Sequence, residues 1–195
     1  MSPLRHSRAH AQAWIELLAD DPEAFSALEV AHRRLPAAAR LAGLRRLRLI
    51  ELSGTLPGRD EVETLLHRST QFYNPHKERC TLRAAAAEPA PVETGERVLL
   101  VTERDGERRE PAERWWHHET GQRVEVREGV AWLLRFEPDA DPPDLDALAI
   151  VRDPQHGLWC NPHSQEARSA ADGVPFPWLA PASRRRAGDS RRRGP

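Results

Sequence analysis

Short hydrophobic runs alternate along the chain with turn residues and with segments that have helical spacing. Residues 12–18 form the first run and predict a strand. Asp21 followed by Pro22 predicts the start of a helix, because an aspartate can cap backbone N–H groups and proline is tolerated in the first turn. Pro36 predicts the end of that helix, since proline cannot continue its hydrogen-bond pattern.

The next run, residues 44–53, is hydrophobic on both sides of a predicted strand. Leu47 and Leu49 share one face, whereas Ile50 and Leu52 share the other. Because side chains alternate between the two faces of a strand, this pattern predicts either a bulge or a strand that is covered on both faces.

The rest of the chain continues the alternation of strands and helices. A short helix and a strand complete the first half, and the clearest strand of the chain opens the second half. Gly121 is expected to end the helix that starts at Glu110-Pro111, because glycine readily adopts the left-handed conformation found at helix ends. The predicted elements are a helix at 60–68, strands at 73–83 and 98–102, a helix from Glu110-Pro111 to Gly121, two strands within 124–136 broken at Glu128-Gly129, and a helix that starts at Pro142-Pro143-Asp144.

The tripeptide Asn-Pro-His occurs twice, at Asn74-Pro75-His76 and at Asn161-Pro162-His163, 87 residues apart. The patterns around both copies also match in the same order, at nearly the same offset. Such a repeat indicates that the chain contains one small fold written twice. The aligned flanks are 43–51 with 129–137, at an offset of 86, and 13–18 with 99–103.

Each half is expected to run strand, helix, strand or strand pair, helix, strand. That order is typical of a ferredoxin-like unit, in which both helices cover one face of an antiparallel sheet. The sequence therefore predicts an α+β protein of two tandem ferredoxin-like (βαββαβ-type) units, with their sheets side by side or back to back. The predicted boundaries are 9–86 for the first unit, 87–95 for a linker, 96–172 for the second unit and 173–195 for a disordered tail rich in proline and arginine.

Composition limits the classes of protein to which this chain can belong. Of its 195 residues, 39% are hydrophobic and 30% are charged, and the formal net charge is −1. Small cores are therefore expected, and without a net basic field neither nucleic acid nor an anionic membrane is an expected partner. The chain has no hydrophobic run of the ~20 residues that span a bilayer, and its N-terminus lacks the hydrophobic stretch of a signal peptide. Both features predict a cytoplasmic protein.

No spacing in the chain is typical of a common catalytic motif. The sequence lacks the order Ser-His-Asp, a glycine-rich phosphate loop and H-E-x-x-H, and its carboxylates are scattered. His117 and His118 would point about 100° apart on a helix, so they are not arranged to chelate one ion. The neighbouring Trp115 and Trp116 are expected in a core or an interface. The sequence therefore favours a non-catalytic protein.

A zinc site is one chemical alternative. His76 and Cys80 are spaced H-x3-C, and Cys160 and His163 are spaced C-x2-H. Together they form a Cys2His2 set, which suits tetrahedral zinc, and the repeat could bring the two pairs together. Against zinc, residues four apart on a strand are ~13 Å apart, and Cys160 aligns with Tyr73 rather than with Cys80. In the competing interpretation the cysteines are small buried residues, and each Asn-Pro-His is a turn.

The segments around both tripeptides resemble the PurS-type small subunit of formylglycinamide ribonucleotide amidotransferase. In that family the last helix leads into a segment with two hydrophobic residues and Ala-Asn-Pro, and a final strand follows. Here tyrosine or cysteine stands in place of that alanine, and the chain has two units where the family has one. The matching residues are Leu65-Leu66 with Phe72-Tyr73-Asn74-Pro75-His76-Lys77-Glu78, and Leu158-Trp159-Cys160-Asn161-Pro162-His163-Ser164-Gln165-Glu166, and the resemblance covers 10–85 and 96–168.

The resemblance implies a non-catalytic role without a cofactor. Subunits of this family associate through their sheets and bridge a glutaminase to an ATP-dependent synthetase in de novo purine biosynthesis. A tandem chain is then expected to contain the pairing that single-unit chains make by dimerising, and a homo-oligomer remains open. The second hypothesis is a regulatory module that binds zinc or a small ligand through the Cys2His2 set. The interface candidates are Asn74, Pro75, His76, Asn161, Pro162 and His163.

Overall fold

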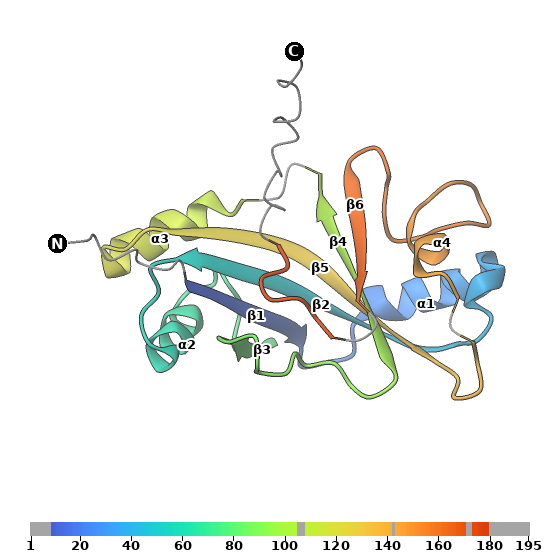
Figure 1. Cartoon of the computed structure of the whole chain (residues 1–195), viewed down its shortest axis with the longest axis horizontal. Helices are drawn as coiled ribbons and strands as arrows, with labels where there is room; N and C mark the ends of the chain where they lie inside the picture. Colours follow the sequence, from blue (N-terminus) through green and yellow to red (C-terminus); the bar gives the residue numbers. More distant parts are fainter. Residues whose placement is uncertain (1–8, 105–107, 142, 171–172, 180–195) are drawn as a thin grey trace, which may run out of the picture.

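A computed structural model describes residues 9–104, 108–141, 143–170 and 173–179 of the protein. Strand, helix, strand, helix, strand follow one another in the first half, and the second half repeats this order (Figure 1). None of the described helices is both long enough and apolar enough to cross a membrane. The elements are β1 (Ala9–Leu17), α1 (Pro22–Arg34), the 3-10 helix η1 (Pro36–Ala38), β2 (Leu41–Gly54), α2 (Arg59–Arg68), β3 (Glu78–Arg83), β4 (Glu96–Glu103), α3 (Glu110–Thr120), β5 (Val124–Phe136), α4 (Leu145–Ala149) and β6 (Gln165–Ala170).

All six strands join in one antiparallel sheet. Their order across the sheet is β3-β1-β2-β5-β4-β6, so β3 and β6 are its two edges. Strands β2 and β5 pair at the centre, from Leu41 opposite Phe136 to Gly54 opposite Val124. The fold is therefore α+β with a single six-stranded sheet, to which each half of the chain contributes three neighbouring strands.

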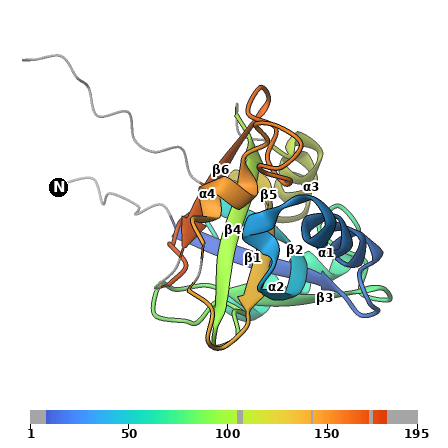
Figure 2. The same ribbon diagram turned by 90° about the vertical axis from the view of Figure 1, so that its right-hand side faces the viewer.

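The four helices cover one face of this sheet in two pairs. Helices α2 and α3 pack together over one end, where Leu66 and Trp116 belong to the same buried cluster (Figure 1). Helices α1 and α4 pack over the other end, where Ala31 and Leu148 share a second cluster (Figure 2). Each pair thus combines one helix from each half of the chain, so both cores depend on both halves.

The opposite face of the sheet is covered by segments without regular structure. Leu47 and Leu49 point to this face, where they meet Val92 of the linker and Trp178 and Leu179 of the C-terminal segment. Ile50 and Leu52, in contrast, lie under the helices. The strand is therefore hydrophobic on both sides because both of its faces are covered.

The C-terminal segment is ordered further than its sequence predicts. Trp178 and Leu179 are each only 5% exposed, because the second sheet face offers hydrophobic positions for them to cover. Buried Glu51 accepts hydrogen bonds from their backbone N–H groups at 2.7 and 3.2 Å. The predicted disordered tail therefore does not include residues 173–179, and residues 180–195 lie outside the described part of the chain.

Two of the predicted helix ends, at Asp21 and Gly121, are confirmed. The Asp21 side chain caps α1 by accepting the N–H groups of Glu23 and Ala24 at 2.9 and 3.3 Å. Gly121 ends α3 in the left-handed conformation, with φ of 69°. These features are confirmed because they depend on a few adjacent residues and little on the rest of the fold.

Strand β5 is continuous, so the predicted break at Glu128-Gly129 is wrong. Gly129 does not form a turn; its lack of a side chain lets neighbouring segments pack closely against β5. A Cβ at Gly129 would lie 2.9 Å from Thr102 Cγ2, closer than real Cβ contacts, and 3.1 Å from Leu179 Cδ2, which is tighter than most. The neighbouring strand and the C-terminal segment therefore explain this glycine, and the sequence around it does not.

The edge strands show how the two halves correspond. Strand β6, at 165–170, begins and ends 87 residues after β3, at 78–83, which is the same spacing as that of the two Asn-Pro-His tripeptides. Ala13 faces Leu82 in the first half, and Leu99 faces Ser169 in the second. Strand β1 is therefore offset from β4 by 86, as the sequence predicts.

The central strands correspond at a different offset. Ala13 also faces Ile50, and Leu99 faces Trp132, so β2 is offset from β5 by 82. The alignment of residues 43–51 with 129–137 is therefore wrong by four residues. A shift of four keeps every side chain on its own face, so hydrophobic alternation alone cannot detect it.

Candidate protein-interaction site

The two Asn-Pro-His segments form the same turn. The Oδ1 atoms of Asn74 and Asn161 each accept the backbone N–H two residues later, at 3.1 and 3.0 Å. Their own backbone N–H groups donate to Glu78 Oε2 at 2.6 Å and to Gln165 Oε1 at 3.0 Å. Both asparagines therefore bond locally and start the edge strands β3 and β6, while the histidines of both turns are exposed.

The proposed zinc ligands are not brought together. His76 and Cys80 belong to one edge of the sheet, and Cys160 and His163 belong to the opposite edge. Five strand spacings of about 4.8 Å separate these edges by ~24 Å, far beyond the reach of one ion. Within the described ranges, no three His, Cys, Asp or Glu side chains are placed to hold a metal. The Cys2His2 set is therefore wrong as a single site.

Both cysteines are free thiols in hydrophobic surroundings. Burial, with the nearby charges of Glu63 and Glu78, raises the pKa of Cys80 to about 12. Burial also raises the pKa of Cys160, which is 1% exposed. The thiols therefore stay protonated at neutral pH, and neither is activated as a nucleophile.

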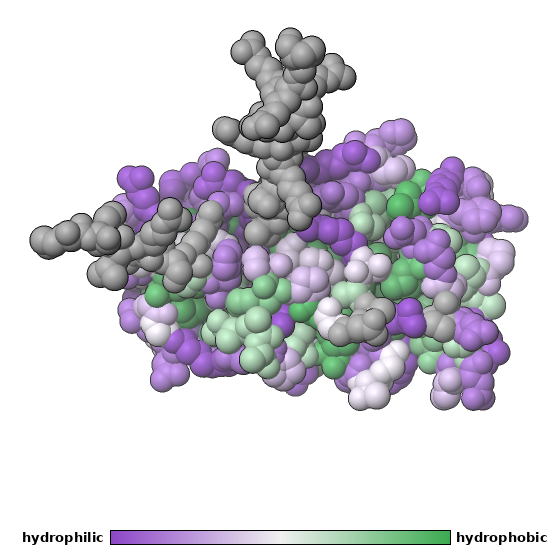
Figure 3. Space-filling view, viewed as in Figure 1, coloured by the Kyte–Doolittle hydropathy of each residue, from purple (hydrophilic) through white to green (hydrophobic). Residues whose placement is uncertain are grey.

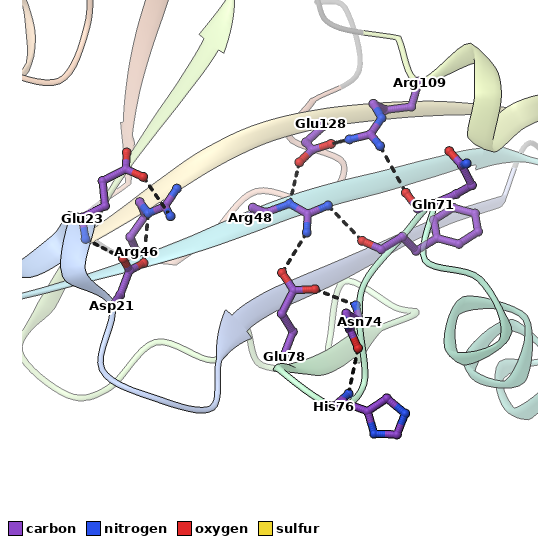
Figure 4. Close-up of polar contacts among 11 residues, drawn as sticks. Asp21, Glu23, Arg46, Arg48, Gln71, Asn74, His76, Glu78, Arg109 and Glu128 are labelled. Carbon is purple, nitrogen blue, oxygen red and sulfur yellow. Dashed lines mark hydrogen bonds and ion pairs between the residues drawn. The ribbon is translucent and has the colours of Figure 1, made fainter.

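A row of charged side chains crosses the sheet between the two helix pairs (Figure 4). Arg48 lies at its centre and donates to Glu128 at 2.7 Å, to Glu78 at 3.0 Å and to the backbone carbonyl of Phe72 at 2.9 Å. Arg109 also pairs with Glu128. We call this row the polar seam, and it comprises Asp21, Glu23, Arg46, Arg48, Glu78, Arg109 and Glu128.

The polar seam repeats one ion pair with exchanged charges. Arg46 pairs with Asp21, the N-cap of α1, at 3.0 Å, whereas Glu128 pairs with Arg109, the N-cap of α3. Arg46 and Glu128 are equivalent at the offset of 82. At the same offset Arg48 is equivalent to Val130, which is also the residue that it faces across the β2–β5 pair. A local twofold axis that relates the two halves of the chain therefore passes between these two residues.

The chemistry of the polar seam is structural. Its three guanidinium groups are paired with four carboxylates, so no guanidinium remains free for an anionic ligand. Burial alone would lower the pKa of Arg48, but hydrogen bonds and charges from Glu128 and Glu78 outweigh it and raise that pKa. No local pattern in the sequence indicates this cluster, because Arg48 and Glu128 are 80 residues apart.

A second feature is an open strand edge in the first half. Strand β1 pairs with β2 only as far as Ile15 opposite Arg48, so residues 41–47 have β5 on one side and no strand from the described ranges on the other. A groove of about 410 Å³ lies at this edge, beside α1. We call this groove the β2 notch, and its lining includes Leu17, Asp20, Phe25, Leu28, Leu44 and Arg135.

Hydrophobic side chains gather at the β2 notch. In the described part of the chain, the exposed large hydrophobic residues are Leu17, Leu18, Phe25 and Val151. Phe25 is 67% exposed and lines the notch together with Leu17, and Leu18 follows directly. Figure 3 shows one face of the molecule, on which hydrophobic patches lie among hydrophilic residues. Clustered exposed hydrophobic side chains are typical of interaction sites.

No protein-family model, curated protein or solved structure matches this chain.

Proposed function

We propose that this protein is a non-catalytic bridging subunit of two fused ferredoxin-like units, related to the PurS-type small subunit. In this proposal it joins the synthetase and the glutaminase of a phosphoribosylformylglycinamidine synthase complex in purine biosynthesis. The observation that carries the proposal is the repeated Asn-Pro-His turn, which starts the last strand of each half at equivalent positions. These are the residues on which the resemblance to that family rests.

The placement of the two turns supports a bridging role. They lie at opposite edges of one continuous sheet, and His76 and His163 are exposed there. Edge strands present unpaired backbone groups, which are suited to bind other proteins. One partner at each edge would then be held at a fixed distance from the other by the sheet itself.

The test is the amidation of formylglycinamide ribonucleotide by the synthetase and glutaminase of the same organism. With glutamine as the nitrogen source, activity should require this chain. With added ammonia, activity should not require it, because a bridge to the glutaminase is then unnecessary. Equal glutamine-dependent activity with and without the chain would contradict the proposal.

Single substitutions test which edge binds which partner. His76→Ala and His163→Ala should each weaken co-elution with one of the two enzymes and leave the other unchanged. His118→Ala is the matched control, since this histidine is also exposed but lies on α3. If all three variants retain both partners, the two turns are not the interfaces.

A further inference from the structure

The β2 notch has an equivalent in the second half of the chain, and there the strand edge is covered. Strand β4 pairs with β5 only as far as Val101 opposite Val130, which leaves residues 124–129 of β5 open in the same way. The segment before α3 occupies that place. Arg108 forms an antiparallel bridge with Arg127, and the backbone N–H of Arg109 donates to Val126 at 2.8 Å.

The first half has no such cover. Arg45 and Leu44 are the equivalents of Arg127 and Val126 at the offset of 82. Among the described residues, no strand or isolated bridge pairs with this side of residues 41–47. Among the residues that the structure describes, one strand edge is therefore covered by the chain itself, and the equivalent edge is open.

The charge around the notch favours a basic occupant. Its lining carries four carboxylates and three guanidinium groups. Arg45 pairs with Glu16, Glu93 and Glu96, at 3.0, 3.4 and 3.0 Å, and Glu16 also pairs with Arg79. Asp20 is exposed and forms no ion pair with any described residue. Arg108 and Arg109, which lie in the equivalent place in the second half, are also basic.

The residues on the two sides of the notch determine which kinds of side chain a bound strand should carry. Leu44, Leu28 and Phe25 lie on the helix side of the notch, whereas Arg45 and its carboxylates lie on the other side. A strand added here would present alternate side chains to these two sides. Hydrophobic residues would meet the first side and basic residues the second.

We propose that the β2 notch binds an extended segment of a partner protein, which adds antiparallel to residues 41–47 of β2 and alternates hydrophobic with basic residues. Backbone hydrogen bonds to the open edge supply binding, and the alternate side chains supply selectivity. The partner at the β2 notch need not belong to the purine complex. A binding test at the notch and the amidation assay can therefore fail independently of each other.

The probe is the peptide acetyl-Val-Arg-Val-Arg-Val-amide, with acetyl-Val-Glu-Val-Glu-Val-amide as its charge-reversed control. Binding to the full chain is measured by NMR titration, with the backbone amides of residues 43–47 as reporters. We expect the arginine peptide to bind at least about fivefold more tightly than the glutamate peptide. The amide shifts should be confined to β2 and the start of α1.

Three variants complete the test. Phe25→Ser and Asp20→Lys should each weaken binding of the arginine peptide by about fivefold or more, and both side chains are exposed, so folding is unaffected. Val151→Ser is the control, since Val151 is also exposed but does not line the notch. The proposal is overturned if neither peptide binds at ~2 mM, if both bind equally, or if Phe25→Ser and Asp20→Lys bind like wild type.

Discussion

Replacing Arg48 with valine gives the first half the residue that stands at the equivalent position, Val130, in the second half. The change removes the central guanidinium of the polar seam. It also removes hydrogen bonds of 2.7 Å to Glu128, 3.0 Å to Glu78 and 2.9 Å to the Phe72 carbonyl. Because these three partners lie on β5, on β3 and in the loop after α2, losing Arg48 should lower the free energy of unfolding.

The magnitude follows from which carboxylate loses its partner. Glu128 keeps Arg109, whereas the one partner that Glu78 keeps among the described residues is the backbone N–H of Asn74. Breaking a buried ion pair costs about 3–5 kcal/mol, which is an upper limit here because the Arg48 side chain is 28% exposed. The new valine recovers about 1 kcal/mol by hydrophobic burial. We therefore expect a loss of about 2 kcal/mol, or roughly 4–8 °C in melting temperature.

A second substitution isolates the electrostatic part of this loss. Glutamine stands at the equivalent of Glu78 in the second half, where Gln165 accepts the same backbone hydrogen bond from Asn161. Glu78→Gln in the Arg48→Val background should therefore remove the unpaired charge, keep the turn and restore about 1 kcal/mol.

Urea denaturation followed by circular dichroism measures the free energy of unfolding of each variant. Arg79→Val is the matched control, since Arg79 also lies on a strand and pairs with a glutamate, but its side chain is 64% exposed. It should cost less than about 1 kcal/mol. The reasoning is refuted if Arg48→Val is no more destabilising than this control, or if Glu78→Gln restores nothing.

Three further outcomes follow from local geometry. Asn161→Ala should lower the free energy of unfolding by about 1 kcal/mol in the urea assay, because the turn before β6 loses an acceptor. Cys80, with its pKa raised to about 12, should react with iodoacetamide at pH 8 far more slowly in the folded protein than in urea; equal rates would contradict its burial. Burial alone would raise the pKa of Glu16, but hydrogen bonds from Arg79 and Arg45 outweigh it and lower that pKa. Its contribution to stability is therefore complete above the ordinary value of 4.5 and is lost as the pH falls through the lowered pKa, so Glu16→Gln should flatten the acid side of the stability–pH curve.

The sequence by itself determined the local features of this protein. The cap at Asp21, the left-handed end at Gly121 and the two Asn-Pro-His turns each depend on a few neighbouring residues. The hydrophobic pattern of residues 44–53 also predicted a strand that is either bulged or covered on both faces, and both of its faces are covered. Such features are readable because backbone hydrogen bonding and side-chain alternation act over only a few positions.

The tertiary structure alone decided how distant parts meet. Pairing of β2 with β5 merges both halves into one sheet, brings Arg48 to Glu128 and places the proposed zinc ligands at opposite edges. It also fixes the register, which hydrophobic alternation leaves open to any even shift. The β2 notch arises in the same way, because β1 ends before β2 does and no local pattern records where a neighbouring strand stops.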